Sequence, residues 1–376
     1  MTGLPTSDAL KRLLPLAPRL GITRIGDLTG LDRIGIPVVQ AVRPLGLANS
    51  VTQGKGTSLD AAAVSAIMEA AEQFFAERVD VMDPVMATAL ELGADTASFG
   101  LHLLEGVAED WHRRSLAWLP AEDLLGGPGG WLPMELVHTA YIDPPLASDG
   151  VFEASTTGLA CGFCRQQAQL HGLLECIERD AIARAQQTHG FFHRFRFEPQ
   201  TLEDETLTLL IEMLQAAGLI AAFWAADAAG NVPTVWCQIM EDEGAVPLMP
   251  LPAEGFASAL DFKRASRGAL LEAAQSRLAA ISGARDDISR LAFPARFDWE
   301  AIDTHRRFLR EGKKSFCYED LANREISGGS ALDPVVERLA ADGITSVLHV
   351  ALDNTPCPEI LASRIFVPQF LPLREA

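Results

Sequence analysis

Two segments of the chain each carry a pair of glutamates three residues apart, Glu69 with Glu72 and Glu175 with Glu178. In a helix this spacing puts both carboxylates on one face, one turn apart. The surrounding residues are apolar enough that both helices should be partly buried, where adjacent negative charges are costly. Mg²⁺ bound to a phosphate-bearing ligand is the usual cation that relieves such repulsion. The two pairs are therefore the first candidate site.

Each pair also has a simpler interpretation. Glutamates at this spacing are common on solvated helix faces, and the first helix also offers Glu77. Glu175 and Arg179 are four residues apart and would form an ordinary surface ion pair. Few other charges lie between Arg165 and Glu175, which makes a fully solvated face less natural for the second helix. On pattern alone, a site and a solvated face are equally good interpretations.

Basic residues near glycines give two further candidates. Gln53-Gly-Lys-Gly56 lacks the spacing of a Walker A phosphate loop, although its glycines would let backbone amides and Lys55 approach an anion. A plain turn explains this segment equally well. Arg277 and Arg285 lie about two turns apart at a predicted helix end. Arginines there either cap carbonyl groups or bind phosphate oxygens.

The cysteines predict no site of their own. Six cysteines in a chain of this length form no disulfide framework, which favours a reducing compartment. Cys161 and Cys164 are two residues apart, but no second pair follows at zinc-site spacing. We interpret them as structural or incidental thiols. The sequence also lacks a nucleophile elbow, so a hydrolase triad has no support.

Composition restricts the class of protein. With 48% hydrophobic residues and a mean hydropathy of +0.13, the 376-residue chain can bury a large core. The formal net charge of −19 argues against general binding to nucleic acids or anionic membranes, though not against a nucleotide. The sequence has no apolar run of about 18 residues and no signal-peptide pattern. We expect a soluble, cytoplasmic protein.

Hydrophobic periodicity and capping residues predict the elements that would hold these groups. Ser58 is an expected N-cap for the helix of the first glutamate pair. Helices are predicted over 8–21, 58–78, 164–187, 203–217, 261–281 and 333–342. Strands are predicted over 34–43, 134–142, 221–224, 233–240, 345–352 and 364–367, with the rest of 80–150 irregular. Because helices and strands do not alternate strictly, we expect an α/β fold of mixed α+β character in one integrated domain.

Several of these segments together resemble the YcaO superfamily, over about residues 20–290. The motifs that carry the resemblance occur in the family's order. They are Asp27–Pro37, Gln53–Gly56, Ser65 to Glu72, Ser155–Gly162, His171–Ala181 and Glu272–Arg277 followed by Arg285–Asp287. Each motif alone is modest evidence, whereas their joint order is specific.

The resemblance implies a non-Walker ATP-binding fold built of mixed sheets flanked by helices, with ATP and Mg²⁺ as cofactors. The domain would span 1–376, with an N-terminal segment (1–45), a nucleotide-binding core (46–290) and a C-terminal segment (291–376). By the same resemblance, the metal ligands would be Glu69, Glu72, Glu175 and Glu178, which with Arg179 are also the implied catalytic residues. The implied nucleotide contacts are Lys55, Ser65, Gln167, Arg277 and Arg285.

The implied reaction activates a backbone amide of a precursor peptide or protein. A substrate side chain or external sulfide adds to the carbonyl, and the oxyanion takes the γ-phosphoryl group of ATP. Azolines or thioamides would result. Phe163 and Gln167 stand where many relatives have Asn and Glu. The sequence also lacks the Pro-x-Pro-x-Pro ending typical of azoline-forming cyclodehydratases and a fused adenylating-enzyme-like domain. We therefore prefer thioamidation with a TfuA-like partner to azoline cyclodehydration, and expect a homodimer.

Two other interpretations stay open. Phe163 and Gln167 remove two polar ligands from the implied site, so the chain could be a non-catalytic YcaO-like subunit that binds a precursor peptide or a partner protein. Four glutamates on two helices would also suit a carboxylate-bridged redox metal protein.

Overall fold

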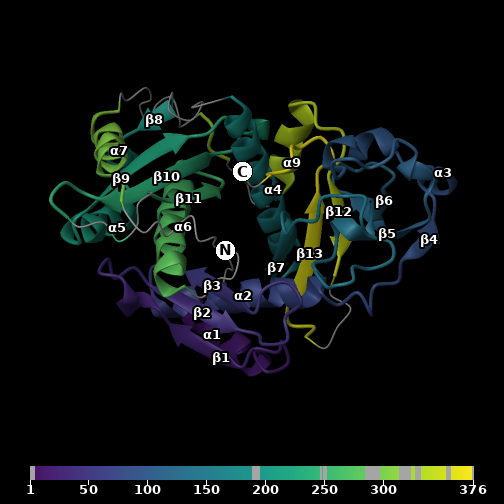
Figure 1. The fold of residues 1–376 in the computed structure, drawn as a ribbon, viewed down its shortest axis with the longest axis horizontal. Helices are drawn as coiled ribbons and strands as arrows, with labels where there is room; N and C mark the ends of the chain where they lie inside the picture. Colours follow the sequence, from purple (N-terminus) through teal and green to yellow (C-terminus); the bar gives the residue numbers. More distant parts are fainter. Residues whose placement is uncertain are drawn as a thin grey trace.

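The helices that carry the glutamate pairs lie among antiparallel sheets (Figure 1). The computed structural model describes residues 5–188, 195–245, 248, 252–283, 297–312, 323–326, 332–352 and 357–374. Within these ranges the strands form three sheets, and each sheet has one long helix packed against it. These helices are α2, α4 and α6, and Figure 1 shows α4 and α6 standing over α2.

The first sheet holds the helix of the first glutamate pair. Its strands pair in the order β1-β2-β3, and α2 packs on β2 and β3 while α1 packs on α2. The Ser58 side chain accepts a hydrogen bond from the Ala61 amide (3.2 Å), so α2 begins after its predicted N-cap. The bounds are α1 (Thr6–Leu13), β1 (Arg24–Asp27), β2 (Val38–Val42), β3 (Val51–Lys55) and α2 (Leu59–Ala76).

Glycine at position 54 lets α2 lie very close to β3. A Cβ atom at Gly54 would lie 2.0 Å from the Ala66 backbone nitrogen and 2.2 Å from the Ala62 carbonyl oxygen. A larger residue would therefore push the helix off the strand. This close approach places α2 beside the end of β3, where Lys55 lies.

The second sheet has different helices on its two faces. Its strand order is β11-β10-β9-β8. On β9, Phe223 belongs to the core shared with α5 and α6, whereas the next residue, Trp224, stacks on Phe308 of α7. The bounds are β8 (Arg196–Phe197), α5 (Glu205–Ala216), β9 (Leu219–Ala225), β10 (Thr234–Glu241), β11 (Ala253–Ser258), α6 (Phe262–Ser282) and α7 (Trp299–Glu311).

The third sheet supports the helix of the second glutamate pair. Its order is β4-β5-β12-β13-β7, with β6 also paired to β5, and α4 packs on β13 and β7. The bounds are β4 (Val85–Ala87), β5 (Leu116–Asp123), β6 (Gly130–Pro133), β7 (Leu159–Gly162), α4 (Arg165–Gln187), β12 (Leu348–Ala351) and β13 (Leu361–Phe366).

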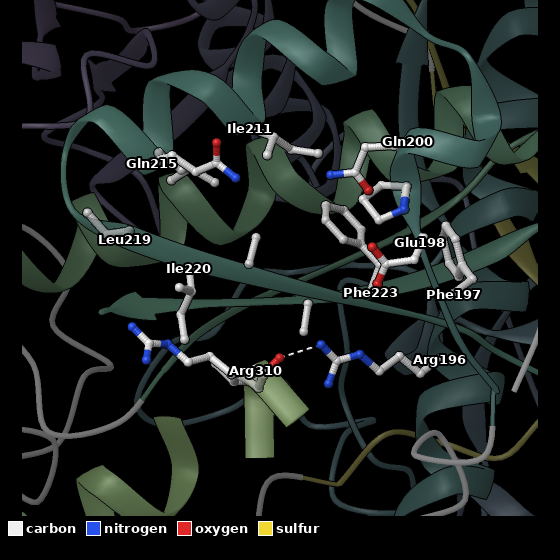
Figure 2. Close-up of a pocket in the computed structure, with 15 residues that line it drawn as sticks. Arg196, Phe197, Glu198, Gln200, Ile211, Gln215, Leu219, Ile220, Phe223 and Arg310 are labelled. Carbon is white, nitrogen blue, oxygen red and sulfur yellow. Dashed lines mark hydrogen bonds between the residues drawn. The ribbon is translucent and has the colours of Figure 1, made fainter. Parts of the chain in front are cut away.

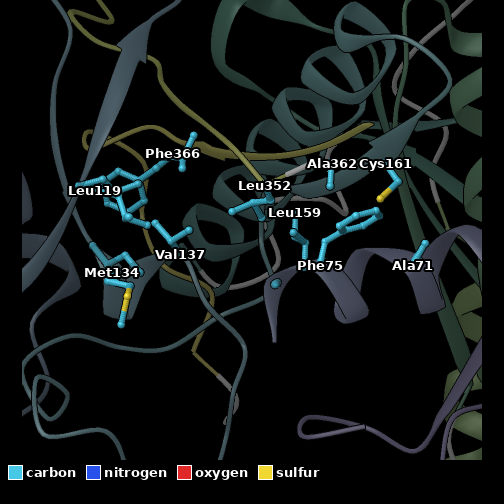
Figure 3. Packing of buried hydrophobic residues seen from close by; sticks show 14 of the residues in the cluster. Ala71, Phe75, Leu119, Met134, Val137, Leu159, Cys161, Leu352, Ala362 and Phe366 are labelled. Carbon is cyan, nitrogen blue, oxygen red and sulfur yellow. The ribbon is translucent and has the colours of Figure 1, made fainter. Parts of the chain in front are cut away.

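One hydrophobic core joins α2 to the third sheet (Figure 3). Ala71 and Phe75 on α2 belong to the same buried cluster as Leu159 and Cys161 of β7 and Ala362 of β13. Ala62, Ile67, Ala71 and Phe75 lie at helical spacing along α2, and all four are buried. The shared core brings the first glutamate pair next to the start of α4.

Most predicted helices are confirmed. α2, α4, α5, α6 and α9 (Leu332–Ala341) lie within a few residues of the predicted bounds. The first helix is shorter than predicted, because Pro15 lacks the amide hydrogen that an α-helix needs, and Leu14–Leu16 form a 3₁₀ turn instead. The helices α3 (Ala89–Leu92) and α7 were not predicted.

The strand predictions are confirmed in part. β2, β9, β10, β12 and β13 occupy predicted segments, but 80–150 is far more regular than expected. The predicted strand over 134–142 is wrong, since Met134–Leu136 form a 3₁₀ helix. There the Glu135 carboxylate turns inward and accepts hydrogen bonds from the amides of Gly150, Val151 and Phe152. Hydrogen bonds from these amides to the buried Glu135 carboxylate thus stabilise this segment in place of strand pairing.

Candidate functional site

Backbone amides hold three of the four predicted glutamates. Glu72 Oε1 accepts a hydrogen bond from the amide of Cys161 (3.0 Å), and Glu175 Oε2 accepts one from Gly158 (3.1 Å). Glu178 Oε2 accepts one from the amide of Ser258 at the end of β11 (3.1 Å). These contacts bring α2, α4 and the second sheet to one place.

A tight turn before β7 makes the Gly158 contact possible. Gly158 has a φ of +81°, and a Cβ atom there would lie 2.1 Å from the Ile365 carbonyl oxygen and 2.7 Å from Cys176 Sγ. Only glycine fits this conformation without strain. Its carbonyl accepts the Ile365 amide (2.8 Å) while its own amide points to Glu175.

The carboxylates are too close together and too buried to ionise normally. Burial, followed by the charges of Glu175 and Glu69, raises the pKa of Glu72 well above its ordinary value. Burial also raises the pKa of Glu175, although Arg179 and the Gly158 amide oppose the shift. For Glu178, burial together with Glu272 and Glu175 raises the pKa to about 7. The cluster therefore favours binding of a cation.

Two cations of the cluster are already paired. Lys55 Nζ lies 2.6 Å from Glu272 Oε2, and the Arg179 guanidinium lies 3.3 Å from Glu178 and 3.8 Å from Glu175. Burial disfavours the charge on Lys55, but Glu272, Glu178 and Glu69 still raise its pKa. Despite burial, Lys55 and Arg179 lower the pKa of Glu272. A site of five carboxylates thus contains two paired cations.

Glu272 is a member of this cluster that the sequence interpretation missed. It lies on α6, 217 residues from Lys55 in sequence. The residue was part of a motif that indicated family resemblance, but only Arg277 and Arg285 received roles there. Glu272 could have been identified from the sequence, because it is the only acidic residue of that helix and lies five residues before Arg277.

One face of α4 continues the site toward its N-terminus. Gln167, His171 and Glu175 follow each other at four-residue spacing, so their side chains share that face. Gln167 Oε1 is buried and has no hydrogen-bond partner. His171 was not predicted as a site residue. Desolvation by the surrounding protein, followed by the charge of Lys55, lowers the pKa of its imidazole to about 4. Ser65 lies on α2 one turn before Glu69 and is partly buried.

Two predicted or candidate residues, Arg277 and Glu77, lie outside this cluster. Arg277 is 1% exposed, and its guanidinium contacts Asp32 (2.8 Å) and Glu241 (2.8 Å), so we assign it to the fold rather than to phosphate binding. Glu77 is buried against Arg43 (2.7 Å). Arg285 lies outside the described residues.

The donor set fits Mg²⁺ only together with a phosphate ligand. Within the described ranges, no three His, Cys, Asp or Glu side chains are arranged to hold a metal ion by themselves. Mg²⁺ in proteins is commonly bound by one or two carboxylates, waters and substrate phosphates, which does not require a complete protein cage. The raised pKa values and the orphaned Gln167 oxygen agree with this kind of site.

A separate cavity lies away from the glutamates, between α5, β8, β9 and the end of α7 (Figure 2). It measures about 260 Å³ and is lined by residues that include Phe197, Ile211 and Phe223. Its buried cation, Arg196, donates to the carbonyls of Phe308 and Leu309 and so caps α7. Among the predicted site residues that the structure describes, none lines this cavity.

Comparison with known proteins decides the family. The model of a family described as YcaO cyclodehydratase, ATP- and Mg²⁺-binding, matches residues 53–371. The chain belongs to the YcaO family. The resemblance noted in the sequence is therefore confirmed, as is the expectation of ATP and Mg²⁺ as the cofactors of this family.

Individual relatives agree with this assignment. The chain is 31% identical to an uncharacterized protein of Methanothermobacter thermautotrophicus, over 96% of this chain and 93% of the relative. It is 32% identical to an uncharacterized protein in a tfuA 3′ region of Rhizobium leguminosarum bv. trifolii, over 93% and 83%. Its fold is similar to that of YcaO from Methanopyrus kandleri bound with AMPPCP and Mg²⁺ (TM-score 0.73, 23% identity, coverage 97% and 91%). The predicted mixed α/β fold is confirmed.

Two further expectations meet the structure directly. The side chain of Cys161 is buried and that of Cys164 is exposed. None of the described helices combines the length and the apolar character needed to cross a membrane.

Proposed function

We propose that this YcaO protein uses ATP and Mg²⁺ to activate a backbone amide of a peptide or protein substrate by phosphorylating the amide oxygen. The observation that carries the proposal is the convergence of five glutamates on three helices, with raised pKa values at Glu72, Glu175 and Glu178. Such a cluster is unfavourable without cations, and Mg²⁺ held against a triphosphate supplies them.

Each residue has a role in this proposal. Glu69, Glu72, Glu175 and Glu178 would hold Mg²⁺, with Glu272 as a further acidic ligand. Lys55 and Arg179 would leave their carboxylate partners in part and bind phosphate oxygens. Ser65 and Gln167 would line the edge of the nucleotide pocket, the latter through its unpartnered oxygen.

The chemistry follows from the poor reactivity of an amide. A nucleophile adds to the carbonyl carbon, and the π electron pair moves to the oxygen. That oxygen then bonds to the γ-phosphorus while the bond to the β-phosphate oxygen breaks and ADP leaves. Finally the C–O bond breaks and inorganic phosphate leaves. With sulfide (HS⁻) as the nucleophile, the added sulfur then loses its proton and a thioamide results. With a deprotonated substrate side chain, the amide nitrogen loses its proton and an azoline results. The protein contributes orientation and charge neutralisation.

Calorimetric titration with Mg²⁺ and AMPPCP tests the nucleotide site. We expect the parent protein to bind the pair, and Glu178→Gln to bind at least about tenfold more weakly, because a metal ligand loses its charge. Glu212→Gln, an exposed glutamate on α5, is the matched control and should bind like the parent. Failure of the parent to bind would reject the proposal.

Thioamidation rather than azoline formation is the finer part of the proposal. It is supported by the relative found in a tfuA 3′ region, which suggests a TfuA-like partner. Mass spectrometry of cellular peptides and proteins, in cells carrying the parent or Glu178→Gln, separates the two outcomes. Exchange of oxygen for sulfur in parent cells alone supports thioamidation, whereas loss of water supports azoline formation.

The remaining proposals concern assembly. We propose one domain over 1–376, a homodimer, and binding of a TfuA-like protein and a precursor peptide. Light scattering of the purified protein, alone and mixed with a TfuA-like protein from the same genome, measures both assemblies.

A non-catalytic role is the second candidate, and Phe163 favours it. Its ring lies 4.6 Å from the Arg12 guanidinium and packs on the hydrophobic core, so it offers no metal ligand. Binding of Mg²⁺–AMPPCP without release of phosphate from ATP, even with substrate and partner present, would support this role.

A further inference from the structure

Arg364 on β13 is a buried cation with no carboxylate partner among the described residues. It is 2% exposed, and burial lowers its pKa. One nitrogen, Nη2, donates to the Ser155 carbonyl (2.5 Å), whereas Nε and Nη1 are buried without any hydrogen-bond acceptor. Unsatisfied donors on a buried charge are costly, so this arrangement points to a ligand that the guanidinium serves.

The position of Arg364 relates it to the proposed nucleotide site. Ser155 begins the turn that ends at Gly158, whose amide holds Glu175. The charges of Arg364 and Glu175 influence each other, and Tyr141 is also within electrostatic range. Arg364 therefore lies beside the carboxylates but takes no part in their ion pairs.

The other cations near the site already have acidic partners. Lys55 is paired with Glu272, and Arg179 with Glu178 and Glu175. Arg277 is saturated by Asp32 and Glu241 outside the cluster. Among the described residues, Arg364 is thus the buried cation beside the site whose N–H groups, at Nε and Nη1, have no hydrogen-bond acceptor.

Building on the proposed function, we propose that Arg364 donates hydrogen bonds to the oxygen of the bound substrate amide, and that these bonds strengthen as that oxygen becomes anionic. Negative charge develops there when the nucleophile adds to the carbonyl carbon, and a preorganised cation then stabilises it most. This assignment gives the two unused donors of Arg364 an acceptor only when the substrate is present.

The substrate must displace a covering side chain to reach these donors, because Nε and Nη1 are not exposed in the structure. In this proposal the side chain that moves is Tyr141, which lies within electrostatic range of Arg364. Its side chain is 44% exposed, and it belongs to the irregular segment after Met134–Leu136.

Arginine side-chain NMR tests the contact directly. The full chain is labelled with ¹⁵N-arginine, and loss of a signal in Arg364→Lys identifies the Nε–H resonance of Arg364. The probes are Mg²⁺–AMPPCP and then the tripeptide N-acetyl-Gly-Cys-Gly-amide. We expect this resonance to move only when the tripeptide is added. Movement with the nucleotide alone, or with neither probe, would overturn the proposal.

Binding measurements on variants give a second, independent result. Arg364→Gln should bind Mg²⁺–AMPPCP within about twofold of the parent but the tripeptide at least about tenfold more weakly, with Arg364→Lys in between. Arg184→Gln, an exposed arginine on α4, is the control. If Arg364→Gln lost affinity for the nucleotide and the tripeptide equally, Arg364 would have a structural role and the proposal would be overturned. If the parent binds no nucleotide, the proposed function fails first, and the inference with it.

Discussion

Glu178 is a proposed metal ligand whose burial among other carboxylates should destabilise the folded protein when no cation is bound. Its carboxylate is buried between Arg179, Glu175, Glu272 and the nearby Lys55, and its pKa is raised to about 7. In the unfolded chain the same group has a pKa near 4.5. The folded protein therefore holds a proton that the unfolded chain has released between these two values.

This difference predicts how stability depends on pH. Without cations, the free energy of unfolding should fall as the pH rises from about 4.5 to about 7, by ~1–3 kcal/mol from Glu178. Glu178→Gln cannot ionise, so this decrease should be smaller and the variant more stable than the parent at pH 8. Urea unfolding in EDTA at pH 5 and pH 8 measures the effect, with Glu212→Gln as control. A parent whose stability rises over this range would contradict the assignment.

Lys55 and Glu272 form a pair whose energy can be isolated. Each side chain is less than one-third exposed, at 29% and 23%, so removing one partner leaves the other charge poorly compensated. Lys55→Met and Glu272→Gln should each destabilise the protein by about 1–2 kcal/mol. The double variant should lose less than the sum of the two. Thermal unfolding of the four proteins gives the coupling energy, and strict additivity would show that the pair is not coupled.

At the scale of elements, the contact between α2 and β3 depends on one missing side chain. Gly54→Ala would place a methyl group against the backbone of Ala62 and Ala66, neither of which can rotate away. We expect a loss of about 3 kcal/mol or more in the free energy of unfolding, and weaker binding of Mg²⁺–AMPPCP as Glu69 and Glu72 shift. Gly100→Ala, with nothing within 4 Å of the new atom, should have little effect on the urea midpoint. Comparable losses in both variants would refute the packing argument.

The helices were predictable from sequence because their signals are local. Ser58 marks the start of α2, and apolar residues at helical spacing identify the buried faces of α2 and α4. Short strands were less predictable. Gln53–Gly56 was interpreted as an anion-binding loop or a plain turn, since its glycines would let backbone amides approach an anion. In the structure, residues 53–55 belong to β3, and Gly54 serves close packing inside that strand.

At the scale of the whole molecule, the site depends on contacts between distant parts of the chain. The Cys161 amide is 89 residues from Glu72, and the Ser258 amide is 80 residues from Glu178. No local pattern encodes such contacts, so spacing alone left a solvated face as good an interpretation as a site. The same limit explains Arg277, whose partners Asp32 and Glu241 join the first and second sheets.

Ligand binding should stabilise the whole fold, because three sheets meet at the glutamates. We expect Mg²⁺ with AMPPCP to raise the melting temperature. At a ligand concentration a hundredfold above Kd, binding adds ~2.7 kcal/mol to the free energy of unfolding. Neither component alone should match this effect, since the described carboxylates form no complete metal cage. Differential scanning fluorimetry with EDTA reversal measures it. A full shift with Mg²⁺ alone would indicate a preformed metal site instead.

The backbone hydrogen bonds at Gly158, Cys161 and Ser258 have an evolutionary consequence. Amide donors belong to every residue except proline, so Cys161 and Ser258 can be exchanged for other residues of similar size without loss of the donor. The orientation of the glutamates then depends on the backbone conformation and not on the identity of the neighbouring side chains. Homologues can therefore diverge widely around these carboxylates and still present the same acidic surface to a ligand.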